Sequence, residues 1–216
     1  ILALFILSFY SGRSICALAK NHAVTADSPT IVIDAGHGGM DPGKISASGI
    51  EEKDINLSIA LYLKQLFENH GYNVVMTRTT DTDVTDEDRV KASNSSNAYV
   101  CVSFRMNSYN SDASVSGAES YIHTSKPTEA VELSRIILKN MESSTGIKNR
   151  GVKTGTVAAA KDNYYINAHC KCTSCIINMG FITNASDLKK VTTGKDNTAQ
   201  AIADGILEYL KQAGLY

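Results

Sequence analysis

The sequence predicts a single α/β domain in which a mostly parallel, twisted sheet is covered by helices on both faces. Short runs rich in Val and Ile alternate along the chain with longer segments of helical periodicity, an order typical of parallel strands joined by crossover helices. The chain has 216 residues, enough for one full hydrophobic core but cramped for two. No internal repeat or low-complexity tract interrupts the pattern.

Five segments are predicted to be strands because they are apolar, β-branched and short. The first of them, which contains TIVIDA, ends at Gly36 and so delivers its end to a loop. The fourth alternates polar and apolar residues more than the others do. In chain order the predicted strands are 30–36, 72–78, 98–104, 117–124 and 174–181.

Four segments are predicted to be helices from apolar residues at helical spacing or from capping signals. Gly71 is expected to stop the first helix, Thr85 to cap the second and Pro127 to begin the third. The predicted helices are 52–71, 85–93, 127–144 and 197–214.

The charge balance limits the classes of partner. With 21 basic and 22 acidic side chains the net charge is −1, so no surplus of positive charge favours nucleic acid or electrostatic attachment to a membrane surface. A binding partner must therefore be inferred from local features of the sequence.

The N-terminal segment ILALFILSFY is apolar over ten residues, too short to span a bilayer but typical of the core of a signal peptide. Small residues follow at the spacing that an export peptidase requires. We therefore expect residues 1–26 to be an export leader and residues 27–216 to be one domain, not an integral membrane domain. The alternative is a buried first helix.

Three cysteines and a histidine crowd into HCKCTSC at 169–175. The cluster permits a zinc interpretation, but structural zinc sites usually draw two ligand pairs from separated turns, and this chain has no second knuckle. We expect Cys170, Cys172 and Cys175 to be small packing residues leading into a strand.

Polar residues follow three of the predicted strands, in DAGHGG, SFRMNS and INMGFITN. Ligands of open α/β sheets bind at the carboxyl ends of the strands, so these segments predict the site. His37 lies between glycines that allow a tight loop, and Glu52 opens the next helix.

These segments resemble the zinc-dependent N-acetylmuramoyl-L-alanine amidases of bacterial cell walls. The resemblance rests on IVIDAGHGGMDPG, the helix at 52–71, the strand at 98–107, NRGVK at 149–153 and INMGFITN at 177–184, and it extends over residues 30–212. It implies a zinc ion held by two His and one Glu, with a second Glu as catalytic base. In the family, the zinc would activate the water that hydrolyses the amide joining the lactyl group of muramic acid to the stem peptide.

Carried over residue by residue, the resemblance places His37 and Glu52 at the first two ligand positions. Arg105 stands at the third ligand position, where the family has His, and Asn178 stands where the family has the catalytic Glu. Asn107 and Tyr165 are the candidate substrate-binding residues. For Tyr164 and Tyr165 the alternative is a role in packing or in the groove wall.

The two substitutions predict that zinc is absent or weakly bound and that hydrolysis is lost or strongly reduced. A guanidinium stays protonated and has no lone pair for a metal, and an amide cannot take a proton from water. We further hypothesise that Arg105 forms a bidentate ion pair with Glu52 in the space of the metal.

The resulting expectation is an exported bacterial protein, secreted or wall-associated, that binds peptidoglycan or a partner protein with little or no hydrolytic activity. One alternative is an active amidase with a remodelled metal site, for which His123 or His169 could supply a ligand. The other is a decayed homologue that retains only the fold.

Overall fold

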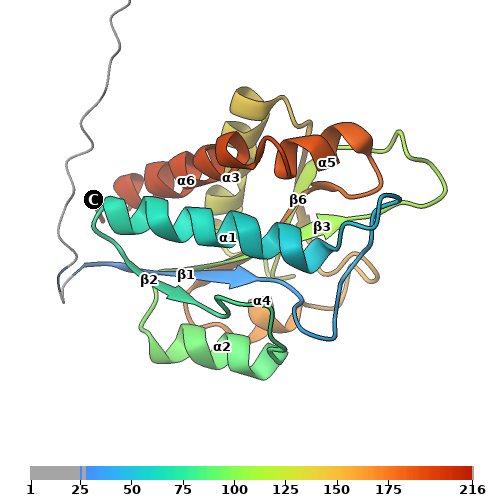
Figure 1. Ribbon diagram of the computed structural model, residues 1–216. Coiled ribbons are helices and arrows are strands. Elements are labelled where there is room, and N and C mark those ends of the chain that lie inside the picture. Colours follow the sequence, from blue (N-terminus) through green and yellow to red (C-terminus); the bar gives the residue numbers. More distant parts are fainter. Residues whose placement is uncertain (1–24, 26–27, 216) are drawn as a thin grey trace, which may run out of the picture.

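The computed structural model describes residue 25 and residues 28–215 (Figure 1). The predicted leader, residues 1–26, lies outside the described residues apart from Thr25 and stays a prediction. Within the described part of the chain, no helix combines the length and the apolar character needed to cross a membrane.

Six strands form one sheet in the order β2-β1-β3-β6-β4-β5. All neighbouring pairs are parallel except β4 and β6, which run antiparallel. The expectation of a mostly parallel sheet is therefore confirmed. The strands are β1 (Thr30–Ala35), β2 (Asn73–Met76), β3 (Val100–Asn107), β4 (Ala118–Ile122), β5 (Asn149–Thr154) and β6 (Thr173–Phe181).

Helices cover both faces of the sheet, as expected. Figure 1 shows α1, α3, α5 and α6 above the sheet and α2 and α4 below it. The helices are α1 (Glu52–Asn69), α2 (Asp86–Ser95), α3 (Thr128–Thr145), α4 (Tyr165–His169), α5 (Ala185–Val191) and α6 (Lys195–Gln212).

The helix boundaries follow the capping signals of the sequence. The Thr85 side chain accepts a hydrogen bond from the Asp88 backbone N–H at the start of α2, and Pro127 immediately precedes α3. Gly71, just past α1, has a φ of +83°, which suits glycine at the end of a helix. Three elements were not predicted: β5, α4 and α5.

The core has a large part and a small part, one on each face of the sheet. The large part lies between the sheet and α1, α3 and α6, and it contains the buried Cys175. The small part lies under α2 and α4, and Cys170 and Cys172 pack against it. The expected packing role of these three cysteines is confirmed.

The strand register brings the two substituted positions together. Arg105 of β3 is the direct neighbour of Asn178 of β6, and Asn178 in turn faces Glu119 of β4. Directly opposed residues of a sheet point to the same face. The side chains of these three residues therefore form one row across the ends of the strands.

Gly205 is the contact point of the α3–α6 packing. A Cβ at this position would lie 2.7 Å from the Cα of Ile137. We expect Gly205→Ala to lower the free energy of unfolding by about 1–3 kcal/mol through overpacking, although Ala is the better helix former. Urea unfolding measures the loss. Asp204→Ala, at the exposed neighbouring position, should change stability little, and an equal loss in both variants would contradict the packing account.

Candidate functional site

A pocket of about 580 Å³ opens where β1, β3 and β6 end. It contains both resemblance-derived ligand positions and both substituted positions, so the structure brings these four residues together. Its lining includes His37, Lys44, Glu52, Arg105, Asn107, Tyr164 and Asn178.

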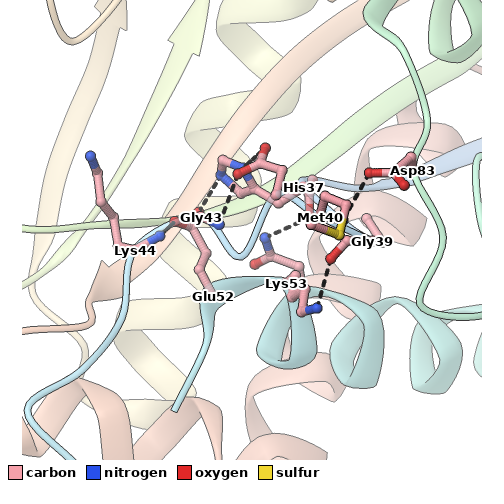
Figure 2. A network of polar contacts seen from close by, with 12 residues as sticks. His37, Gly39, Met40, Gly43, Lys44, Glu52, Lys53 and Asp83 are labelled. Carbon is pink, nitrogen blue, oxygen red and sulfur yellow. Dashed lines mark hydrogen bonds and ion pairs between the residues drawn. The ribbon is translucent and has the colours of Figure 1, made fainter. Parts of the chain in front are cut away.

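The loop after β1 holds His37 in an uncommon backbone conformation. His37 has a φ of +62°, a left-handed value that costs energy for a non-glycine residue and recurs at functional sites. The loop is fixed from outside, because Lys53 Nζ donates to the Gly39 carbonyl and Met40 N–H donates to Asp83 (Figure 2). Gly43 allows close approach, since a Cβ there would lie 2.7 Å from the imidazole.

His37 and Glu52 point toward one another in Figure 2, with Nε2 and Oε1 separated by 3.2 Å. Glu52 is almost fully buried, and both of its carboxylate oxygens also accept backbone N–H groups. Met106 donates to Oε1 at 2.7 Å and Lys44 donates to Oε2 at 2.9 Å. Asp41 Oδ2 contacts the other ring nitrogen of His37 at 2.6 Å.

These contacts shift both pKa values toward the charged forms. Burial opposes protonation of His37, but the hydrogen bond and charge of Glu52, with help from Asp41, raise its pKa. Burial likewise opposes ionisation of Glu52, but His37 and the N–H groups of Met106 and Lys44 lower its pKa.

Arg105 does not form the ion pair with Glu52 that the sequence suggested; that hypothesis is wrong. No carboxylate of the described residues lies within ion-pair distance of Arg105. Its guanidinium carbon lies 5.8 Å from the ring centroid of Tyr164 instead. The physical reason is that backbone N–H groups and His37 already occupy the acceptor positions of Glu52.

Asn107 and Asn178 both line the pocket. Asn107 donates to the buried carboxylate of Glu119 at 2.6 Å, and Arg150 Nε donates to the same carboxylate at 3.0 Å. Sequence reasoning missed Glu119 and Arg150, although Glu119 lies in the alternating strand and Arg150 in NRGVK.

A second pocket, of about 400 Å³, adjoins the first because both are lined by Asn107, Ser108 and Val157. Glu119 and Arg150 line this second pocket. The two together make one groove along the ends of the central strands, suited to an extended ligand.

Tyr164, not Tyr165, lines the groove. Tyr165 stacks on His169, with ring centroids 4.0 Å apart, and packs against the smaller part of the core. His123 lies in a different cavity and bonds Ser125. Tyr164 therefore lines the pocket that contains His37, and neither His123 nor His169 lines this pocket.

A buried ion pair supports the pocket from below. Asp34 is fully buried and accepts a hydrogen bond from Arg89 Nη1 at 2.6 Å. Ser103 and Thr77 also donate to Asp34. Arg89 in turn donates to the backbone carbonyl of His37 at 2.9 Å. The pair thus joins β1, β3, α2 and the His37 loop.

Comparison with protein families decides the lineage. Residues 31–208 match the model of the Amidase_3 family, described as N-acetylmuramoyl-L-alanine amidase. The chain belongs to this amidase family. The amidase LytC of Bacillus subtilis is 34% identical over 185 residues, which cover 84% of this chain and 36% of LytC. The chain thus corresponds to about a third of that relative.

Solved amidase structures share the fold. An N-acetylmuramoyl-L-alanine amidase from Clostridium difficile has a TM-score of 0.77 at 30% identity, covering 86% of this chain and 98% of that one. The CwlD amidase of Clostridioides difficile, in complex with the GerS lipoprotein, has a TM-score of 0.73 at 30% identity. It covers 85% of this chain and 99% of its own.

Amidases of this family are generally zinc-dependent, but the donor set of this member does not fit a catalytic zinc. Such a site needs three protein ligands. His37 and Glu52 offer two, already bonded to one another, and Arg105 places a guanidinium beside them. Among residue 25 and residues 28–215, no three His, Cys, Asp or Glu side chains are arranged to hold a metal ion.

Proposed function

We propose that this amidase homologue binds peptidoglycan in the groove at the strand ends and has lost most or all hydrolytic activity. The observation that carries the proposal is the pairing of Arg105 with Asn178 on adjacent strands, beside the His37–Glu52 contact at 3.2 Å. The family membership supports peptidoglycan as the ligand.

The chemistry of the groove supports binding rather than turnover. Amide hydrolysis needs an activated water and a base to take its proton. Arg105 and Asn178 can donate hydrogen bonds to a bound ligand, but neither can take a proton from water at neutral pH. Loss of a general base alone typically costs about a hundred- to ten-thousand-fold in rate.

The same proposal places the protein outside the cytoplasm, secreted or associated with a bacterial cell wall. The apolar run at residues 1–10 supports export, and relatives such as LytC are amidases of the same family. A partner protein is part of the proposal, since the related CwlD amidase forms a complex with the GerS lipoprotein.

Incubation of the purified chain with cell-wall sacculi tests the proposal. We expect the chain to sediment with sacculi and to release no stem peptide, with or without added zinc. Release of stem peptide that a chelator abolishes would support an active, remodelled amidase instead. If the chain neither sediments with sacculi nor releases stem peptide, only the interpretation as a decayed homologue remains.

Two matched variants locate the binding surface. Val157 and Leu61 are both exposed apolar residues, but only Val157 lines the groove. We expect Val157→Glu to weaken sedimentation with sacculi and Leu61→Glu, which adds the same charge on α1, to leave it unchanged. Equal effects of the two variants would place the binding surface elsewhere.

A further inference from the structure

Arg105 has no carboxylate within ion-pair distance among the described residues. The Nε–H of Arg105 is buried and has no hydrogen-bond acceptor, and no ion pair joins Arg105 to any described residue. Its aliphatic stem packs against Gly36, where a Cβ would lie 2.8 Å from the Arg105 Cγ. The side chain is held by this packing and by the Tyr164 ring, but no acceptor among the described residues bonds its Nε–H.

The other four described arginines have partners. Arg89 pairs with Asp34, Arg150 with Glu119 and Arg135 with Glu132, while Arg78 donates to backbone carbonyls. A buried donor without an acceptor is costly, and such groups in native proteins often indicate a site for a bound molecule. Arg105 therefore differs from the other described arginines, because it faces the pocket and its buried Nε–H has no acceptor among the described residues.

The pocket as a whole favours an anion. Arg105 and Lys44 supply positive charge, and Glu52 is the carboxylate of the lining. Both oxygens of Glu52 are already bonded, to His37 and to two backbone N–H groups. Asn178, beside Arg105, adds an amide N–H donor without adding negative charge.

A guanidinium donates paired hydrogen bonds that suit a planar or tetrahedral oxyanion. The oxyanion that peptidoglycan carries is a carboxylate. The carboxylates of peptidoglycan come from two sources, the stem peptide and the lactyl group of muramic acid. In the family, the substituted position lies where the lactyl amide is cleaved. A lactyl group at that position is an amide before cleavage and a carboxylate after it.

We propose that the Arg105 pocket binds the lactyl carboxylate of glycan strands from which stem peptides have already been removed. This inference rests on the proposed function, because it names the part of peptidoglycan that the groove recognises. The ligand must be supplied by a hydrolase that cleaves the lactyl amide, so this chain would act after a catalytically active amidase.

Titration calorimetry with two matched glycan oligosaccharides tests the inference. One carries free lactyl carboxylates, and in the other the lactyl groups are methyl amides. We expect the carboxylate form to bind about tenfold more tightly, because a charge-assisted hydrogen bond replaces a neutral one. Equal affinity for the two glycans would overturn the inference.

Substitutions at Arg105 test whether this residue causes the preference for the carboxylate glycan. We expect Arg105→Gln to abolish the preference and Arg105→Lys to retain part of it, because Lys keeps the charge but not the paired donors. Arg135→Gln, an exposed control on α3, should keep the full preference. Thermal unfolding of each variant establishes that it is folded. A preference that survives Arg105→Gln would overturn the assignment.

Two further measurements distinguish a failure of this inference from a failure of the proposed function. If free stem peptide binds through Arg105 in place of the lactyl carboxylate, the bound carboxylate does not come from the lactyl group, and this inference is overturned. Sedimentation with intact sacculi tests the proposed function by itself. Sedimentation without any preference for the carboxylate glycan would overturn this inference and leave the proposed function standing, whereas the absence of sedimentation would overturn the proposed function.

Discussion

Asp34→Asn is expected to lower the free energy of unfolding by about 3–5 kcal/mol, the usual cost of leaving one member of a buried ion pair without its partner. Asp34 is fully buried, and its carboxylate accepts hydrogen bonds from Arg89, Ser103 and Thr77. The variant leaves the Arg89 charge inside the protein. Urea unfolding at neutral pH measures the loss.

The same variant has an expected pH dependence. Burial opposes ionisation of Asp34, but the charges of Arg89 and Arg105 and the hydrogen bonds from Ser103 and Thr77 together outweigh it and lower the pKa. A carboxylate whose folded pKa is lowered stabilises the protein above its unfolded pKa, about 4 for Asp, and loses that contribution as the pH falls through the folded value. The difference between wild type and Asp34→Asn should therefore shrink below about pH 4.

The exposed ion pair of Glu132 and Arg135 on α3 provides the control. Glu132→Gln should change stability little, because solvent screens an exposed pair. If Asp34→Asn were as stable as Glu132→Gln, the buried pair would not be supporting the strands and the His37 loop.

Arg105→His combined with Asn178→Glu is expected to create chelator-sensitive amidase activity on sacculi. The first change supplies a third ligand beside His37 and Glu52, and the second supplies a base on the adjacent strand. The base should contribute about a hundred- to ten-thousand-fold over Arg105→His alone. Release of stem peptide with time measures the rate.

The single variants complete this experiment. Asn178→Glu alone should remain inactive, because Arg105 still occupies the third ligand position and places a guanidinium beside the new carboxylate. The effects of the two changes should be strongly non-additive, since ligand and base act as a unit. A double variant that is no more active than wild type would show that other features of the groove prevent hydrolysis.

The regular elements of the fold were predictable where sequence pattern and burial agree. The strand containing TIVIDA is predicted by its β-branched run because both of its faces are covered. In contrast, β5 reads NRGVKT and lies at the edge of the sheet, so it lacks the apolar run. The antiparallel orientation of β4 depends on chain connections that a local pattern does not report.

The site was predictable as a set of positions but not as a set of contacts. The motifs placed His37, Glu52, Arg105 and Asn178 together, and they line one pocket. The expected Arg105–Glu52 pair was wrong because the backbone N–H groups of Lys44 and Met106 bond Glu52. Backbone donors leave no trace in residue identities, so a sequence cannot reveal this competition.

Zinc binding by wild type and by Arg105→His tests the central claim most directly. Both proteins are stripped with chelator, returned to zinc and examined by titration calorimetry and elemental analysis. We expect wild type to bind zinc weakly and Arg105→His to retain it stoichiometrically, because the substitution replaces a fixed cation with a third ligand. Stoichiometric zinc on the wild-type chain would contradict the account.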